Sequence, residues 1–142
     1  MKIYLDNCCF NRPFDDQTQL KINLESQAKL YIQQRILDGE YNLVWSYILD
    51  YENQQNPFEI RKNTIAEWRD ISITIIKEDE TIVAFAETLF EKGIKPKDAL
   101  HIACAKSSGC GYFVTTDKKL LNTSIDGITI LSPINFLEIM EE

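Results

Sequence analysis

Residues 93–119 read GIKPKDALHIACAKSSGCGYFVTTDKK, and this stretch predicts a helix followed by a buried strand. Pro96 suits the first turn of a helix, which then continues toward Gly109 and is apolar on most sides. The aromatic and β-branched run 112–116 follows it and predicts a strand. Because such a helix must be covered on several sides, we expect it to pack against a sheet, as in an α/β protein.

The rest of the chain alternates strands and helices in the same way. We expect strands over 2–5, 42–45, 72–77 and 128–131. We expect helices over about 16–38, 46–55, 57–69, 78–92 and the segment after Pro133. Asp16 and Gln19 form a capping pair at the start of the first of these helices. Residues 7–17, with Pro13 among turn formers, predict a loop. This order and its short connections predict one domain over 1–142, with a mostly parallel sheet covered by helices on both faces.

Composition narrows the class of protein further. The 142 residues are 44% hydrophobic and 26% charged, which suits one globular domain. Because no apolar run is long enough for a membrane span and the start lacks signal-peptide features, we expect a cytoplasmic protein with no membrane partner. The four cysteines have no CxxC spacing, and with a single histidine they do not predict a structural zinc site. The net charge of -7 argues against coating nucleic acid through a general positive field.

Acidic residues stand where such a fold gathers its ligands. Asp6 and Asp117 each follow an expected strand, and Asp98 lies in the first turn of the helix that begins at Pro96. The carboxyl ends of parallel strands and the starts of the following helices share one edge of the sheet. Exposed N–H groups at that helix start stabilise a carboxylate. We therefore expect these three acids to converge.

A fourth acid comes from the helix after Trp45, where Asp50 and Glu52 are the two candidates. Glu52 shares a helix face with the apolar Ile48 and Leu49, at spacings of four and three. Asp50 lies on the more polar side. We prefer Glu52 as the inward-pointing acid.

Four converging carboxylates require a compensating cation. Two such charges 4 Å apart repel by up to about 4 kcal/mol at an effective dielectric near 20. An all-oxygen ligand set suits Mg²⁺ or Mn²⁺, and both ions bridge readily to phosphate oxygens. A phosphodiester substrate follows, with the metal activating water and stabilising charge on the phosphate.

Four motifs together resemble the PIN-domain family, over almost the whole chain. They are LDN at Asp6, the helix with Glu52, GIKPKDALHIACA around Asp98, and YFVTTD ending at Asp117. The stretch YLDNCCFNRPFDDQ resembles one bacterial subgroup. The resemblance implies a three-layer α/β/α fold, a Mg²⁺- or Mn²⁺-dependent ribonuclease, frequently a VapC-like toxin with an antitoxin partner, and a homodimer.

The resemblance also implies roles for individual residues. Asp6, Glu52, Asp98 and Asp117 correspond to the family's catalytic, metal-binding acids, and Thr115 corresponds to its hydroxyl residue two before the last acid. Many members carry a further acid shortly after that one. Here Lys118, Lys119, Leu120 and Leu121 follow instead, so the number of metals, one or two, stays open.

Basic residues near these acids are candidate phosphate contacts. We favour Arg12 as a substrate-binding residue, because its short segment follows Asp6 directly. The lysines are read equally well as phosphate contacts or as solvated charges; they are Lys95, Lys97, Lys118 and Lys119. His101 lies three residues after Asp98, but a lone histidine is commonly structural and we leave it out of the catalytic set.

The leading hypothesis is an endoribonuclease with Mg²⁺ or Mn²⁺ as cofactor and RNA as substrate. Asp6, Asp98 and Asp117 bind the metal, and Glu52 helps to bind it or orients the attacking water. The alternative is a catalytically weak PIN-fold module that binds nucleic acid or protein, which the charge of -7 favours. A phosphatase of the haloacid dehalogenase type needs an acid two residues after the first, where Cys8 stands. RNA and single-stranded DNA are not distinguished by the sequence.

Overall fold

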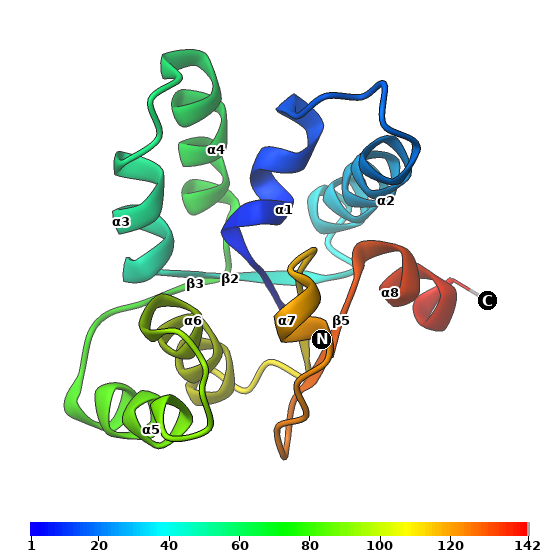
Figure 1. Ribbon diagram of the computed structural model, residues 1–142. Helices are drawn as coiled ribbons and strands as arrows, with labels where there is room; N and C mark the ends of the chain where they lie inside the picture. The colour runs from blue at the N-terminus through cyan, green and yellow to red at the C-terminus, as the bar shows by residue number, and fades with distance from the viewer. Residues whose placement is uncertain (142) are drawn as a thin grey trace.

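A parallel sheet forms the centre of the molecule in the computed structural model, which describes residues 1–141 (Figure 1). Its five strands are β1 (Lys2–Leu5), β2 (Asn42–Ser46), β3 (Thr74–Ile76), β4 (Tyr112–Val114) and β5 (Thr129–Leu131). They lie in the order β3-β2-β1-β4-β5, and every neighbouring pair is parallel. The predicted α/β class is confirmed.

Helices cover both faces of this sheet. One face carries α1 and α2 together with α4, and α5 and α6 cover the other (Figure 1). The helices are α1 (Asn7–Asn11), α2 (Leu20–Leu37), α3 (Tyr47–Gln54), α4 (Glu59–Ile71), α5 (Glu80–Phe90), α6 (Pro96–Ser107), α7 (Lys118–Leu121) and α8 (Pro133–Met140), with a 3₁₀ turn η1 (Arg12–Phe14). The three-layer α/β/α arrangement is therefore present.

The central strands are apolar because both of their faces are covered. Ile3 and Tyr4 of β1, Val44 of β2 and Phe113 of β4 are all fully buried. Strands enclosed in this way are continuous apolar runs, without the alternation of a half-exposed strand. The run 112–116, predicted as a strand from the sequence, forms β4 over its first three residues, of which Phe113 and Val114 are buried.

The predicted loop over residues 7–17 was wrong, because α1 and η1 lie there. The Asp6 side chain accepts a hydrogen bond from the Asn7 backbone N–H and thereby caps α1. Cys9 and Phe10 of α1 are buried in the core. A five-residue helix has too little periodicity to be recognised from its sequence.

Two predicted helix starts also differ from the structure. Helix α2 begins at Leu20, and Asp16 instead accepts hydrogen bonds from the backbone and hydroxyl of Thr18, so it forms a local turn and not a helix cap. Helix α4 begins at Glu59, two residues beyond Pro57. By contrast, Pro96 and Pro133 both begin helices as expected.

The order in which strands are added to the sheet reverses between β1 and β4. From β1 the chain adds β2 and β3 on one side, and it then crosses to add β4 and β5 on the other. Ligand sites of open parallel sheets lie at the carboxyl ends of the strands on either side of such a reversal. Leu5 pairs with Val114, and the Asp6 N–H donates to the Val114 carbonyl at 2.9 Å. The residues after both strands are therefore neighbours.

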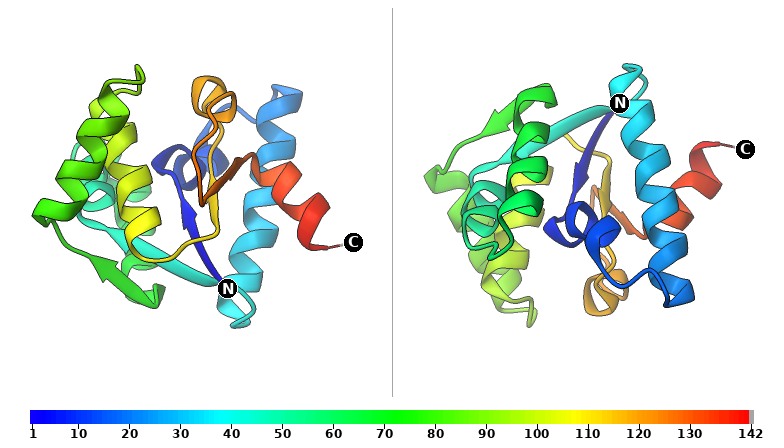
Figure 2. Two further views of the ribbon diagram at one scale, coloured as in Figure 1. Left: turned by 90° about the horizontal axis from the view of Figure 1, so that it is seen from below. Right: turned by 90° about the horizontal axis from the view of Figure 1, so that it is seen from above.

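The C-terminal helix α8 packs along α2 (Figure 2). Its end is held by Arg35 of α2, whose Nε lies 2.6 Å from Glu141 Oε1. This contact lies away from the carboxyl ends of β1 and β4. Among residues 1–141, no helix combines the length and the apolar content that crossing a bilayer requires.

Candidate active site

Asp6 is the most firmly held acid of the site. It follows β1 directly, and only 6% of the residue is exposed. One carboxylate oxygen accepts the Asn7 N–H at 2.8 Å, and the other accepts the Thr115 hydroxyl at 2.8 Å. These hydrogen bonds leave lone pairs on both oxygens, so the carboxylate is oriented but can still bind a cation.

Glu52, rather than Asp50, faces the site. Ser46 ends β2 and caps α3 through the Leu49 N–H, and the turns that follow bring Glu52 against the His101 imidazole. Asp50 instead accepts the Trp45 indole N–H at 2.8 Å and lies 3.3 Å from Arg69 Nε. The structure thus gives Asp50 a role in holding α3 to β2 and α4.

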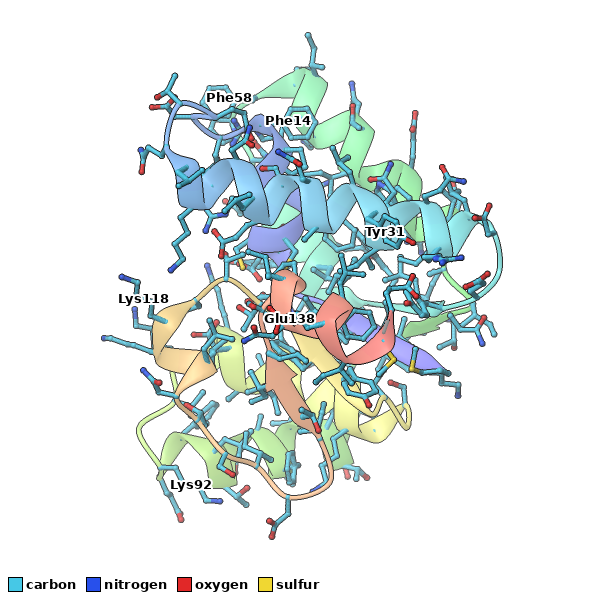
Figure 3. The ribbon with its side chains drawn as sticks, turned by 90° about the vertical axis from the view of Figure 1, so that its right-hand side faces the viewer. Phe14, Tyr31, Phe58, Lys92, Lys118 and Glu138 are labelled. Carbon is cyan, nitrogen blue, oxygen red and sulfur yellow. The ribbon has the colours of Figure 1, made fainter. Side chains whose placement is uncertain are left out.

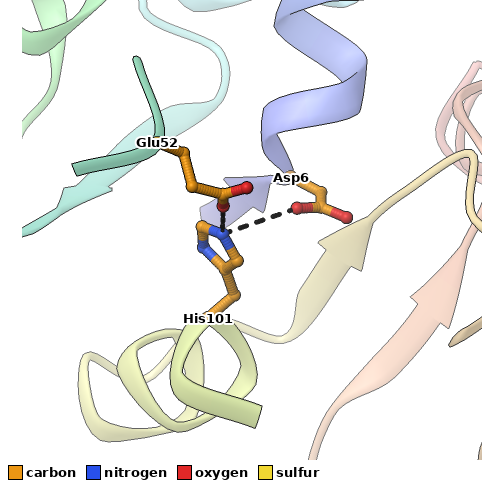
Figure 4. A group of neighbouring side chains, drawn as sticks. All are labelled: Asp6, Glu52 and His101. Carbon is orange, nitrogen blue, oxygen red and sulfur yellow. Dashed lines mark hydrogen bonds and ion pairs between the residues drawn. The ribbon is translucent and has the colours of Figure 1, made fainter. Parts of the chain in front are cut away.

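His101 lies at the centre of the group. It is fully buried on α6, its Nε2 contacts Glu52 Oε1, and the same nitrogen lies 3.8 Å from Asp6 Oδ1 (Figure 4). Its other nitrogen, Nδ1, lies 2.6 Å from the Tyr4 hydroxyl. Sequence reasoning left His101 out. One feature of the sequence could have indicated that His101 belongs to the site. It lies three residues after Asp98, and this spacing puts both side chains on one side of α6.

Asp98 and Asp117 line an open cavity of about 450 Å³ beside this group, together with Glu52, Lys95 and Lys97. Burial, together with the negative charges of Asp6 and Asp117, raises the pKa of Asp98 to about 6. The site therefore concentrates more negative charge than its protein surroundings neutralise.

Asp117 has a second role at the start of α7. Its carboxylate accepts the backbone N–H groups of Lys119 and Leu120, at 2.8 and 3.4 Å. Its own N–H donates to the Thr115 hydroxyl at 3.1 Å. Asp117 is therefore both a helix cap and a wall of the cavity.

The donor atoms present fit a divalent cation. One oxygen each of Asp6 and Glu52 and a nitrogen of His101 all lie within 4.8 Å of one another. Two carboxylates, one imidazole and the nearby acids Asp98 and Asp117 supply ligand types that divalent ions use. The sequence predicted oxygen ligands alone, and in the structure an imidazole nitrogen also lies among these atoms.

The prediction of Arg12 as a free phosphate contact does not agree with the structure. Its guanidinium lies 3.1 Å from Asp15 and 3.3 Å from Glu25, and it donates to the Thr116 hydroxyl at 2.8 Å. These partners hold η1 against α2 and the end of β4. A guanidinium occupied on several sides has little capacity left for a substrate phosphate.

The comparison with protein families assigns the chain to a class. The PIN domain family model matches residues 3–125, and the chain belongs to the PIN domain family. Among solved structures, VapBC2 from Rickettsia felis bound to a DNA fragment from its promoter is similar in fold, with a TM-score of 0.56 and 15% sequence identity. That match covers 92% of this chain and 97% of the other. No curated protein sequence matches this chain.

Proposed function

We propose that this protein is a metal-dependent endoribonuclease. The observation that carries the proposal is the convergence of Asp6, Glu52 and His101 within 4.8 Å, next to a cavity lined by Asp98 and Asp117. This group lies where the strand order reverses, at the carboxyl ends of β1 and β4. Membership of the PIN family supports the same chemistry.

The proposed mechanism is hydrolysis without a covalent intermediate. Bound Mg²⁺ or Mn²⁺ supplies Lewis acidity, which activates water and neutralises charge on the attacked phosphate. Asp6, Asp98 and Asp117 would hold the cation, from the two strand ends and the start of α6. Glu52, with 21% of its side chain exposed, helps to hold the cation or orients the attacking water. The products carry 5′-phosphate and 3′-hydroxyl ends.

The cavity wall supports a nucleic-acid substrate. Lys95 and Lys97 line the cavity with the acids, and Lys119 lines its continuation toward α7. Lysines at these positions counter the local repulsion between phosphates and a chain of net charge -7. They contact the backbone of the substrate and set its position, not its sequence.

Tyr51 supports an unpaired strand as the substrate. It precedes Glu52, is 50% exposed, and has the Lys97 Nζ 5.4 Å from its ring centroid. An exposed ring beside an ammonium offers a stacking surface for a base and a contact for the adjoining phosphate. We therefore propose single-stranded RNA rather than a duplex.

We also propose that the protein is the toxin of a toxin–antitoxin pair. The likeness in fold to VapBC2 supports this role. An apolar groove of about 300 Å³ between α2 and α4 is a candidate surface for the antitoxin, because Leu30, Leu37 and Ile71 along it are all partly exposed. At its end Phe14 and Phe58 lie beside each other (Figure 3), and the Arg61 guanidinium lies within 5.4 Å of both ring centroids. A cytoplasmic homodimer completes the proposal.

The decisive experiment is cleavage of a labelled RNA pool with Mn²⁺, Mg²⁺ or EDTA, using the wild type, Asp6→Asn and Asp98→Asn. We expect cutting that depends on the metal and is lost in both variants. Equal cutting by the variants would refute the assignment. If the folded wild type binds RNA or a protein partner but does not cut, the chain is a binding module of PIN fold.

A further inference from the structure

His101 is held in one orientation by a buried series of polar contacts. Its Nδ1 lies 2.6 Å from the Tyr4 hydroxyl, which lies 2.6 Å from the Ser46 hydroxyl. All three residues are fully buried. The Tyr4 ring is itself immobilised, because it stacks on Phe113 with an interplanar angle of 8° and meets the imidazole edge-on. Only Nε2 of His101 therefore faces the acids.

The two hydroxyl groups allow Nδ1 of the imidazole to keep its hydrogen bond to Tyr4 in either tautomer. In one direction Ser46 donates to Tyr4, Tyr4 donates to Nδ1, and Nε2–H donates to Glu52. In the other, Nδ1–H donates to Tyr4 and Tyr4 donates to Ser46, which leaves a lone pair on Nε2. Each hydroxyl can both donate and accept, so the contacts among Nδ1, Tyr4 and Ser46 persist in both directions. The second direction gives up the Nε2–H bond to Glu52, and a cation bound at Nε2 would replace it.

A cation between Asp6 and Glu52 selects the second direction. Nε2 lies 3.8 Å from Asp6 Oδ1 and contacts Glu52 Oε1. One ion with bonds of about 2.1 Å spans ligand atoms up to about 4 Å apart, so a single ion reaches both Asp6 and His101. An Nε2–H would direct its positive end at the ion, whereas the lone pair binds it.

We propose that His101 Nε2 is a direct ligand of the divalent cation, beside Asp6 and Glu52, and that the site consequently binds Mn²⁺ more tightly than Mg²⁺. This inference rests on the proposed metal-dependent function and specifies its metal. Mg²⁺ takes oxygen ligands almost exclusively, whereas transition ions accept imidazole nitrogen. Tyr4 and Ser46 are then the outer partners that orient the histidine, an arrangement common for metal-bound imidazole.

The chain offers a direct spectroscopic test, because it contains one histidine. Tag-free wild-type protein is loaded with Mn²⁺ and measured by pulsed electron paramagnetic resonance, with and without ¹⁵N-labelled histidine. We expect nitrogen couplings to Mn²⁺ that change with the label. Bound Mn²⁺ without such couplings would overturn the inference and make His101 a positioning residue that only donates to Glu52. This test requires no variant to fold.

Calorimetric titration provides the second test. We expect wild-type protein to bind Mn²⁺ at least about tenfold more tightly than Mg²⁺, and His101→Gln to reduce that ratio to within about threefold. An unchanged ratio in a folded variant would contradict the inference. The two proposals can fail separately. A wild-type protein that binds neither ion would contradict both the metal-dependent function and the ligand role of His101. Bound Mn²⁺ without nitrogen coupling removes only this one.

Discussion

The Thr115 hydroxyl donates to Asp6 Oδ2 at 2.8 Å and accepts the Asp117 N–H at 3.1 Å, so one side chain joins the ends of β1 and β4. The register of the two strands, with Leu5 opposite Val114, makes this contact. It orients the Asp6 carboxylate and the start of the segment that carries Asp117. In the proposed site Thr115 is therefore a positioning residue, which would act on a cation through Asp6.

Replacing this hydroxyl is expected to weaken cation binding. Thr115→Val keeps the volume of the side chain but removes the hydrogen bond to Asp6, and outer partners of this kind contribute about 10- to 100-fold in metal affinity. Calorimetric titration with Mn²⁺ measures the loss. Thr115→Ser retains the hydroxyl and is the matched control, which we expect to stay near wild type. Equal affinity for Thr115→Val and wild type would contradict this role.

The two acids of α3 give a matched pair of variants. Glu52→Gln is expected to lower Mn²⁺ affinity and RNA cleavage, because this carboxylate belongs to the donor group. Asp50→Asn is expected to lower the free energy of unfolding by about 1 kcal/mol, through its bonds to Trp45 and Arg69, and to leave metal affinity unchanged. Urea unfolding and metal titration separate the two effects. A reversed pattern would assign the site to Asp50.

Substitution of Tyr51 tests whether the substrate stacks at the cavity mouth. Tyr51→Ala is expected to weaken binding of a single-stranded RNA oligonucleotide by about 1–3 kcal/mol, and Tyr51→Phe to retain it. Fluorescence anisotropy in the inactive Asp6→Asn background measures binding without cleavage. Tyr31→Ala is the control, because Tyr31 is similarly exposed but lies on α2. Equal loss for both alanine variants, or no loss for either, would reject the stacking role.

Lys29 destabilises the fold at neutral pH. It is buried on α2, lies over the Phe10 and Trp68 rings, and donates to Gln33; its burial lowers its pKa to about 8. Lys29→Met is therefore expected to stabilise the protein at pH 7 by up to about 3 kcal/mol. Between about pH 8 and 10, Lys29 is still protonated in the unfolded chain but has lost its proton in the folded protein. Over this pH range the stability of the wild type therefore rises relative to that of the variant. Urea unfolding at pH 7 and 9.5 measures this difference, and parallel profiles would contradict it.

Asp98 links metal binding to pH. The pKa of Asp98 is about 6 in the folded protein, which is above its pKa in the unfolded chain. The protonated carboxyl group therefore contributes stability that is fully present below about pH 4 and is lost as the pH rises through 6. In EDTA at pH 7, Asp98→Asn is therefore expected to be about 1–2 kcal/mol more stable than wild type, after allowance for solvent screening. At pH 4 the difference should vanish. Denaturant unfolding at both values is the measurement, and a difference that persists at pH 4 would reject this explanation.

Removal of the metal should expose the repulsion between Asp98 and the neighbouring acids in the wild type. At an ion concentration 100 times the dissociation constant, Mn²⁺ is expected to stabilise the folded state by about 2.7 kcal/mol at pH 7. The gain should shrink toward pH 5, because a protonated Asp98 binds the cation poorly. Thermal unfolding with Mn²⁺ and with EDTA, at both pH values, checks this. No stabilisation at pH 7 would argue against a cation site.

The alternation of strands and helices, and the places of the acids along it, follow from local patterns in the sequence. Asp6 and Asp117 follow apolar runs whose enclosure on both faces is a local property of composition, and Pro96 sets the start of the helix that carries Asp98. Spacing on a helix also separated Glu52 from Asp50. These features depend on backbone periodicity and turn chemistry, which short stretches of sequence contain.

Which side chains meet depends on how the helices and strands pack together. The packing paired β1 with β4, brought His101 against Glu52 and Asp6, and placed Arg12 beside Glu25 and Thr116. The physical reason is that these contacts join residues far apart in the chain, and their partners depend on strand order and on the rotation of each helix about its axis. Neither quantity leaves a local pattern, so a histidine buried on an apolar helix and an arginine after an acid could not be assigned before the elements were packed.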